Sequence, residues 1–296
     1  MRLFHFRSLF LLMFILALSG LLTLAPAFAG SRVTTQVYLP LIAKNFQSGP
    51  AVISGIVYDA TIGKQNGALA GAQVCIQNTT NCEITDVDGT YSLGGINNGL
   101  QTIVVSKTGY STLTRQINAQ YYDGSQQSIT VVDLALSINN LGSNQYRIVL
   151  SWSPARPVDL DANLWVPPDG YQVANSSGTG TGSCSTSPWA CIDIDSVDGN
   201  APESITIAQA QPGTYIYAVR HYDFASGTTN NKPPLSQTSA HVDVYDNSGL
   251  IASYDVPSSS DDFAVWWHVF DMDGATGAIT TINTINSANP AGGIYP

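Results

Sequence analysis

The chain is poor in charged residues and almost lacks glutamate. Lys, Arg, Asp and Glu make up only 11% of its 296 residues, and Glu83 and Glu203 are the two glutamates. Surface helices usually carry many charged residues, so this composition does not favour a helical protein. Gly, Ser, Thr, Asn and aromatic residues are plentiful, which is typical of extracellular proteins built from short strands. We therefore expect an all-β fold, and the length suggests two folded domains.

Sequence signatures of catalysis are also missing. There is no His-Glu-x-x-His motif of zinc peptidases and no Gly-x-Ser-x-Gly nucleophile motif. With two glutamates, an acid–base pair for glycoside hydrolysis would have to use aspartates, and nothing marks a substrate cleft. His221, His241 and His268 fall in three separate predicted strands, where each is expected to be structural or exposed. A serine triad assembled from distant residues is left open, but we expect no enzymatic activity.

The N-terminal region has the pattern of a secretory signal peptide. Arg2 and Arg7 accompany an apolar run from Ser8 to Leu24, and Ala27-Phe28-Ala29 matches a small-x-small cleavage site. An uncleaved membrane anchor is the alternative, because the run is nearly long enough to span a bilayer. Pro26 and the cleavage pattern favour removal of residues 1–29. We therefore expect a secreted, extracellular protein, typical of bacteria, without integral membrane association.

The negative charge excludes several kinds of partner. The formal net charge is −10, and loss of Arg2 and Arg7 with the signal peptide would make it −12. Nucleic-acid binding is disfavoured, because phosphate neutralisation needs a basic patch, and anionic membranes are disfavoured for the same reason. The remaining partner classes are an extracellular glycan or an extracellular protein. The sequence does not indicate an oligomeric state.

Four cysteines form two local pairs, each with six intervening residues. In an exported protein an even number of cysteines indicates disulfides. A zinc site is the alternative, but zinc sites need closer spacing within each pair. We therefore predict the disulfides Cys75–Cys82 and Cys184–Cys191.

Residues 51–137 have the pattern of a β-sandwich, following a linker at 30–50 that contains a short apolar patch, VYLPLI, of unassigned role. Turn residues such as Asp88-Gly89 and Gly109 separate short apolar runs, and seven strands of this length favour a sandwich. The strands are expected at 52–58, 72–78, 82–86, 90–94, 100–107, 111–119 and 127–136.

Four stretches of this segment match a known pattern. They are Ile53–Asp59 (ISGIVYD), Leu69–Val74 (LAGAQV), Thr85–Leu93 (TDVDGTYSL) and Lys107–Tyr110 (KTGY). In these stretches residues 51–137 resemble the carboxypeptidase regulatory-like domain, a transthyretin-type sandwich. The resemblance implies an accessory module without catalytic residues of its own, and it does not make the chain a peptidase.

A linker at 138–144 leads to a second domain at 145–284, which is also expected to be a β-sandwich. The Gly/Ser/Thr-rich segment 167–188 reads as a loop, and the tail 285–296 is expected to be disordered. The strands are expected at 146–153, 158–166, 190–195, 203–208, 213–222, 239–246, 250–256, 263–271 and 278–283.

The second domain also carries a recurring pattern of short motifs. They are Trp152, Asp159-Leu160-Asp161, Pro202–Ile205 (PESI), Gly213-Thr214-Tyr215 and Trp267–Phe270 (WHVF). By these residues the segment is similar to an uncharacterised β domain of secreted bacterial proteins, which implies no particular function.

Two acidic strands stand out in this domain. In Pro157–Trp165 (PVDLDANLW), Val158, Leu160, Ala162 and Leu164 share one face, while Asp159 and Asp161 share the other. The second strand, Cys191–Gly199, alternates in the same way. Asp is depleted in strands, and like charges on neighbouring strands destabilise a sheet unless a cation offsets them. Six carboxylates are therefore candidate ligands of one cation: Asp159, Asp161, Asp193, Asp195, Asp198 and Glu203.

An oxygen-only ligand set without His or Cys points to Ca²⁺ before Mg²⁺. The spacing does not fit an EF-hand loop, because Val197 stands where the third oxygen ligand is needed, so the site would combine two strands and a loop. A solvated acidic face and hydrogen-bonded structural aspartates are the alternatives. Asp86–Gly89 and Asp271–Gly274 also pair aspartates with glycine, but we expect them to form turns.

All five tryptophans lie in the second domain. In Val265–Phe270, alternation predicts that Val265, Trp267 and Val269 form a core face. Trp266, His268 and Phe270 would then share the opposite face. They are candidate ligand-binding residues, because an exposed Trp can stack on a sugar ring, or they form a second buried face.

Overall fold

The computed structural model describes residues 51–120, 129–152, 158–175, 180–199 and 201–292. The predicted signal peptide and the linker at 30–50 lie outside these residues. The described residues are almost entirely β-strand, with one four-residue helix and one 3₁₀ turn. The expected all-β sandwich fold is therefore confirmed. No helix in these residues is long and apolar enough to cross a membrane.

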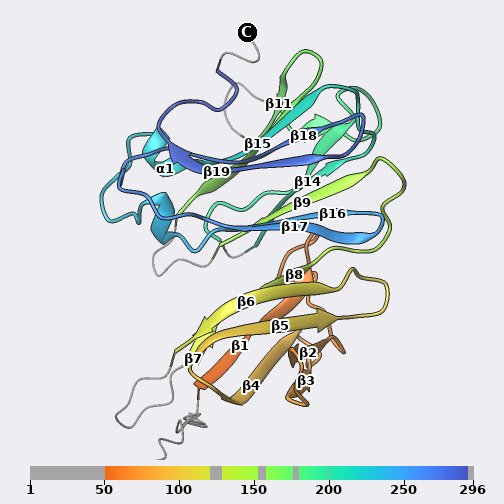
Figure 1. Cartoon of the computed structure of the whole chain (residues 1–296), viewed down its shortest axis with the longest axis vertical. Helices are drawn as coiled ribbons and strands as arrows, with labels where there is room; N and C mark the ends of the chain where they lie inside the picture. The colour runs from red at the N-terminus through yellow and green to blue at the C-terminus, as the bar shows by residue number, and fades with distance from the viewer. Residues whose placement is uncertain (1–50, 121–128, 153–157, 176–179, 200, 293–296) are drawn as a thin grey trace, which may run out of the picture. The chain divides into compact units, whose positions relative to one another are not determined.

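Strands β1 to β8 form a sandwich of two four-stranded sheets (Figure 1). In one sheet β1 pairs antiparallel with β4 and parallel with β7 and β8. The other has the antiparallel order β3-β2-β5-β6. The predicted strand 127–136 is thus divided into β7 and β8. The bounds are β1 (Ala51–Asp59), β2 (Gln73–Ile76), β3 (Cys82–Ile84), β4 (Thr90–Ile96), β5 (Gly99–Ser106), β6 (Leu113–Ala119), β7 (Ile129–Val131) and β8 (Leu134–Leu136).

The turn before β4 shows why its sequence is Asp-Gly. Gly89 has φ +77°, and a Cβ there would lie 2.5 Å from the Val57 carbonyl oxygen, so only glycine fits. The Asp88 carboxylate accepts hydrogen bonds from the Thr90 backbone N–H and hydroxyl. The expectation that Asp86–Gly89 forms a turn is confirmed. The second stretch is only partly a turn, because Asp271 to Asp273 end strand β18 (Trp266–Asp273) and the turn begins where the Asp273 carboxylate accepts three such bonds.

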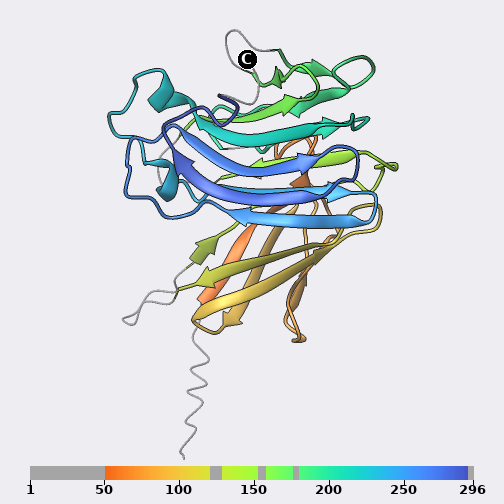
Figure 2. The same ribbon diagram turned by 45° about the horizontal axis from the view of Figure 1, so that its top comes forward.

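Strands β9 to β19 form a second, larger sandwich of antiparallel strands. Its five-stranded sheet has the order β11-β10-β15-β18-β19 and its six-stranded sheet the order β12-β13-β14-β9-β16-β17. Figure 2 shows these sheets as separate layers. Helix α1 (Tyr222–Ala225) and the 3₁₀ turn η1 (Leu235–Gln237) lie between β15 and β16. The bounds are β9 (Tyr146–Ser151), β10 (Leu160–Val166), β11 (Tyr171–Val173), β12 (Gly182–Ser183), β13 (Ala190–Ile194), β14 (Glu203–Ile207), β15 (Thr214–His221), β16 (His241–Asp246), β17 (Gly249–Asp255), β18 (Trp266–Asp273) and β19 (Ile279–Asn286).

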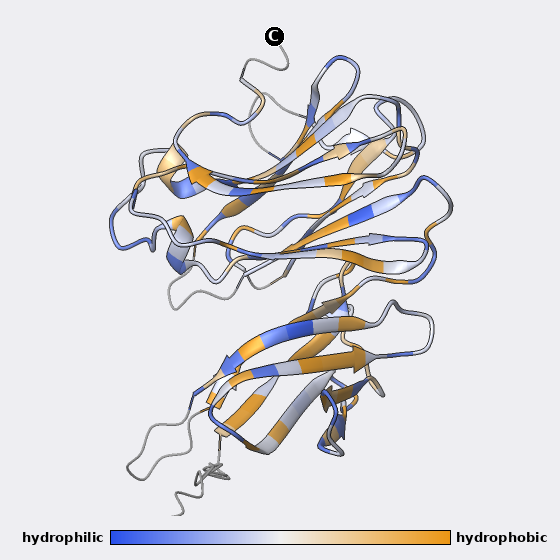
Figure 3. Ribbon diagram, viewed as in Figure 1, coloured by the Kyte–Doolittle hydropathy of each residue, from blue (hydrophilic) through white to orange (hydrophobic). Residues whose placement is uncertain are grey.

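Alternating side chains of these strands fill the core of the second sandwich. Along β10, Leu160, Ala162, Leu164 and Val166 point into this core, and Trp165 lies in a separate cluster on the other face. Figure 3 shows apolar and polar residues alternating along many of the strands. The predicted faces of PVDLDANLW are confirmed, and the alternation keeps its aspartates out of the core.

Two boundaries of the second domain differ from expectation. The segment 167–188 contains β11 and β12, because its Tyr171–Val173 stretch pairs with the end of β10. The predicted disordered tail begins too early, since β19 continues to Asn286 and Ala291 is buried beside Trp165 and Trp266. Residues 293–296 lie outside the described part of the chain.

Candidate metal centre

Three carboxylates from two sheets converge at one edge of the second sandwich. Asp159 precedes β10, Asp161 is the second residue of β10, and Glu203 is the first residue of β14. One oxygen of each lies within 4.8 Å of the others. Of the six carboxylates expected at a cation site, the structure brings these three together.

An open strand edge explains how Glu203 reaches its neighbours. Strand β11 pairs only with Leu164–Val166 of β10, while β15 covers the opposite edge. The first half of β10 therefore has unpaired backbone groups on one side, and the Ala162 N–H donates a hydrogen bond to Glu203 Oε2. The carboxylate thus occupies the place that a longer β11 would take.

Two oxygens of this centre lack partners. Asp161 and Glu203 are only 4% and 2% exposed, and Asp161 Oδ2 and Glu203 Oε1 have no hydrogen-bond partner. The Arg220 guanidinium is at the limit of ion-pair distance, with Nη1 4.0 Å from Asp161 Oδ2. A buried carboxylate oxygen without a partner is costly, because it has lost its water.

The pKa values follow from this burial. Burial, and then the charges of neighbouring aspartates, raise the pKa of Asp159 to about 6. Burial and the charge of Asp159 raise the pKa of Asp161 to about 7, against the opposing effect of Arg220. Burial raises the pKa of Glu203 well above its usual range. At neutral pH the centre therefore needs either shared protons or a bound cation.

Further charges surround the three carboxylates. The charge of Asp195 raises the pKa of all three, and that of Asp198 raises the pKa of Asp159, so both belong to the surroundings of the centre. Asp223, which no sequence pattern indicated, accepts a hydrogen bond from the Asp159 N–H at 3.0 Å and pairs with Lys232 at 3.0 Å. It lies 64 residues from Asp159 in the chain, so only the fold reveals this contact.

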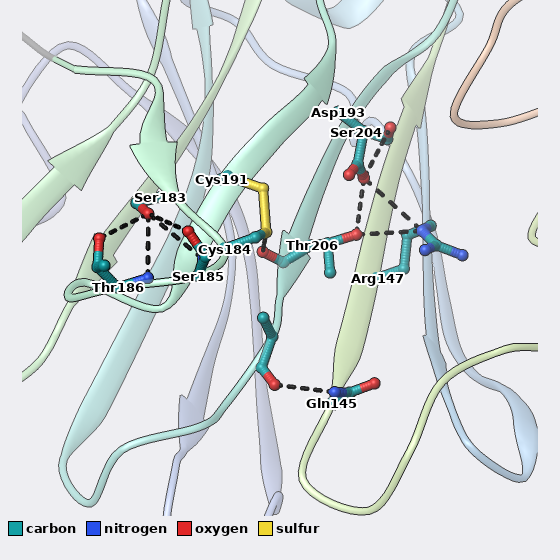
Figure 4. The surroundings of a disulfide bond; sticks show 11 residues. Gln145, Arg147, Ser183, Cys184, Ser185, Thr186, Cys191, Asp193, Ser204 and Thr206 are labelled. Carbon is teal, nitrogen blue, oxygen red and sulfur yellow. Dashed lines mark hydrogen bonds and ion pairs between the residues drawn. A yellow bond between two sulfur atoms is a disulfide. The ribbon is translucent and has the colours of Figure 1, made fainter.

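Asp193 does not belong to the centre, contrary to expectation. Its Oδ2 accepts hydrogen bonds from the hydroxyls of Thr206 and Ser204 and lies 3.7 Å from Arg147 Nε, as Figure 4 shows. The register of β13 shifts between Ile192 and Ile194. This irregularity breaks the alternation that would have placed Asp193 and Asp195 on one face.

The donor set of the centre fits a hard cation. The three nearest side chains offer only carboxylate oxygens, and oxygen ligands without nitrogen or sulfur suit Ca²⁺ or Mg²⁺. Two of these oxygens are buried and have no hydrogen-bond partner. Ca²⁺ tolerates irregular geometry better than Mg²⁺, which suits ligands that come from two sheets.

The candidate ligand-binding face Trp266, His268 and Phe270 is not a common surface. The register of β18 shifts between His268 and Phe270, and Phe270 is fully buried, stacked at 5.3 Å on Tyr217. Trp266 is 8% exposed and lies against Trp165, with ring centroids 5.6 Å apart. His268 Nε2 contacts Asp271 Oδ1 at 2.7 Å. An extra residue in a strand is not visible in an alternating pattern, which is why the expectation of one shared face was wrong. The alternative of burial holds for Trp266 and Phe270.

Both predicted disulfides are present. Cys75–Cys82 joins β2 to β3, and Cys184–Cys191 closes the loop before β13. The alternative of a four-cysteine zinc site is thereby excluded. The loop around Cys184 also carries Ser183, Ser185 and Thr186, whose hydroxyl groups meet in Figure 4.

The first sandwich matches a known domain family. Residues 53–142 match the family model of the CarboxypepD_reg-like domain. The resemblance inferred from ISGIVYD and the following stretches is therefore confirmed for this segment. The family model leaves the second sandwich unmatched, and its similarity to an uncharacterised secreted β domain stays a prediction.

Comparison with other proteins gives no functional assignment. No curated protein matches the chain. Similar solved structures include a cohesin–X-dockerin complex of Acetivibrio cellulolyticus, at 21% identity over 30% of this chain and 59% of that chain, with a TM-score of 0.22. The major pilin subunit BcpA of Bacillus cereus matches at 12% identity over 69% of this chain and 67% of that chain, with a TM-score of 0.24. A candidate carbohydrate-binding protein of Bacteroides uniformis matches at 10% identity over 71% of this chain and 100% of that chain, with a TM-score of 0.22.

Proposed function

We propose that the chain is a secreted, non-catalytic binding or structural protein whose second sandwich is stabilised by Ca²⁺ at Asp159, Asp161 and Glu203. The observation that carries this proposal is the pair of buried oxygens without a hydrogen-bond partner, Asp161 Oδ2 and Glu203 Oε1, beside a third carboxylate. Secretion is supported by the N-terminal sequence pattern and by the two disulfides, which persist in oxidising compartments.

A cation at this position would cross-link the two sheets of the second sandwich. Asp161 belongs to the five-stranded sheet and Glu203 to the six-stranded sheet. Both would share one ion at an edge where backbone pairing stops. The ion would offset the repulsion of the carboxylates, and the gain would appear as resistance to unfolding.

The non-catalytic part of the proposal is supported by the one Ser–His–Asp contact among the described residues. Ser253 Oγ lies 3.0 Å from His241 Nε2, and His241 Nδ1 lies 2.6 Å from Asp255 Oδ1. A second carboxylate, Asp243, contacts both the Ser253 hydroxyl at 2.7 Å and His241 Nε2 at 3.1 Å. Burial alone would lower the pKa of His241, but Asp243 and Asp255 raise it overall. Asp243 competes with His241 for the Ser253 hydroxyl, and all four side chains lie on two paired strands, so this group is suited to holding β16 and β17 together.

Thermal unfolding of the full chain in calcium and in EDTA tests the proposal. Calcium at one hundred times its Kd stabilises by about 2.7 kcal/mol, which corresponds to a rise of roughly 5–10 °C in the unfolding temperature. We expect this rise in the wild type and in Asp193→Asn, and its loss in Asp161→Asn. Equal unfolding temperatures in millimolar calcium and in EDTA would contradict the metal centre.

A role as accessory subunit of a secreted hydrolase or peptidase is a second candidate. The match of residues 53–142 to the CarboxypepD_reg-like domain favours it. It predicts that the purified chain turns over no ester, glycoside or peptide by itself, yet changes the activity of a hydrolase with which it copurifies. Turnover by the chain alone, lost in Ser253→Ala, would contradict both candidates.

A further inference from the structure

A cavity of about 320 Å³ lies in the loops beside β11 and β12, at the far end of β10 from the metal centre. We propose that it binds one neutral sugar unit of an extracellular polysaccharide. Its volume falls within the range of small-molecule sites. The lining residues are Asp169, Tyr171, Gly182, Ser183, Ser187 and Pro188.

The lining combines a flat ring with hydroxyl and carboxylate groups. The side chain of Tyr171 is exposed, which makes its ring available for stacking against the C–H face of a sugar. No hydrogen bond among the described residues engages the Tyr171 hydroxyl, the Asp169 carboxylate or the Ser187 hydroxyl. A sugar offers hydroxyl groups that both donate and accept, so it can satisfy all three.

Ser183 is held in place by its own loop. Its Oγ accepts hydrogen bonds from the N–H groups of Ser185 and Thr186, at 3.3 and 3.1 Å, and from the Thr186 hydroxyl at 2.8 Å. Apart from the Thr186 hydroxyl, which donates to it, the only acceptor near the Ser183 hydroxyl among the described residues is Ser185 Oγ, 3.5 Å from Ser183 Oγ. The Ser183 hydroxyl can therefore donate a hydrogen bond to a ligand. The Cys184–Cys191 disulfide next to it closes the loop, as Figure 4 shows.

The ring of Tyr171 is positioned as well. Its backbone pairs with Val166 at the end of β10. A Cβ on Gly180 would lie 2.1 Å from the Tyr171 hydroxyl oxygen, so the end of the Tyr171 side chain lies against the Gly180 backbone. The Ser183 side of the cavity is arranged before a ligand arrives, which reduces the entropy lost on binding.

The charge of the lining selects among sugars. Asp169 is its one charged side chain. A single carboxylate repels uronic acids and sulfated sugars but accepts hydrogen bonds from neutral hydroxyl groups. The ligand class is therefore a neutral hexose or pentose unit.

This site is independent of the metal centre. Val166 and Leu160 are the two ends of β10, and six residue steps of a strand span about 20 Å. Sugar binding should therefore persist in EDTA and in Asp161→Asn. Failure of either proposal leaves the other open to its own test.

Affinity electrophoresis of the full chain provides the experiment, with β-glucan, xylan, galactomannan and hydroxyethylcellulose in the gel and polygalacturonate as the anionic control. We expect retardation by at least one neutral polysaccharide, in calcium and in EDTA alike, and none by polygalacturonate. Tyr171→Ala should weaken the retarding affinity by about tenfold or more. Tyr171→Phe, which keeps the ring, should weaken it less.

The matched control is Phe263→Ala, which removes an aromatic side chain that is exposed elsewhere in the domain. It should bind as the wild type does. The proposal is overturned if no neutral polysaccharide retards the chain, if EDTA abolishes retardation, or if Tyr171→Ala binds as tightly as Phe263→Ala.

Discussion

The Glu203 carboxylate of β14 accepts a hydrogen bond from the Ala162 backbone of β10, so one side chain links the two sheets of the second sandwich. Its other oxygen is buried without a partner. The same carboxylate therefore accepts from the N–H at a strand edge and leaves one buried oxygen that a proton or a cation must satisfy. This combination is expected where a cation completes a structural centre.

Glu203→Gln separates these two roles. The amide oxygen of Gln can still accept from Ala162, while the negative charge is removed. In EDTA we expect an unfolding temperature equal to or above that of the wild type, because repulsion among the carboxylates is reduced. The rise caused by calcium should disappear. Glu203→Ala also leaves the Ala162 N–H without an acceptor, so this variant should lose about 1–3 kcal/mol of stability. A full calcium response in Glu203→Gln would rule out this carboxylate as a ligand.

The metal-free protein should lose stability as pH rises. The pKa values of Asp159 and Asp161 are raised to about 6 and about 7 from the usual 3.8. Between about pH 4 and 7 the folded state binds more protons than the unfolded state, so its free energy of unfolding falls with increasing pH. Calcium needs the ionised carboxylates and should offset this fall. Unfolding temperatures measured with EDTA and with calcium should therefore diverge from about pH 5 toward about pH 8. Parallel curves would contradict the prediction.

A substitution at Asp193 tests whether the acidic residues of the two predicted strands all take part in calcium binding. Asp193→Ala removes an acceptor of Thr206 and a charge near Arg147, which is only 5% exposed. We expect a loss of about 1–3 kcal/mol in urea unfolding. The calcium-induced rise in unfolding temperature should equal that of the wild type. A reduced calcium response would return Asp193 to the metal centre.

The sequence predicted those parts of the centre that depend on strict alternation. Asp159 and Asp161 lie outside the core because β10 has no irregularity between Leu160 and Val166. Asp193 and Phe270 were misplaced because β13 and β18 each contain a shift of register. Such a shift inserts one residue into a strand and has no residue signature in these strands.

Contacts between residues that lie far apart in the chain could not be predicted from the sequence. Asp223 reaches Asp159 from the segment after β15, and Glu203 reaches Ala162 across an edge that exists only because β11 is short. Strand β11, which pairs with β10, and the cavity proposed to bind a sugar also lie in a segment that was expected to be a loop. Composition and turn residues were sufficient for the all-β class and for both disulfides, since these depend on local chemistry.

The two disulfides offer a matched comparison. Each joins cysteines seven residues apart, so chain entropy predicts a loss of about 2.5 kcal/mol on removal of either. Replacing Cys184 and Cys191 by serine should in addition weaken polysaccharide binding, because that loop carries Ser183. Replacing Cys75 and Cys82 should leave binding unchanged. Urea unfolding and affinity electrophoresis of both double variants provide the measurement, and equal binding by both would argue against the cavity.

Trp266 distinguishes a buried aromatic cluster from a sugar platform. Its ring packs on Trp165 and lies 5.7 Å from the Arg220 guanidinium. Trp266→Ala should therefore cost about 3–5 kcal/mol in urea unfolding, as large-to-small changes at buried aromatics do. Trp266→Phe fills part of the same space and should cost less. Under conditions where the variants remain folded, their retardation by neutral polysaccharides should match that of the wild type. Loss of retardation without loss of stability would show that Trp266, and not Tyr171, contacts the sugar.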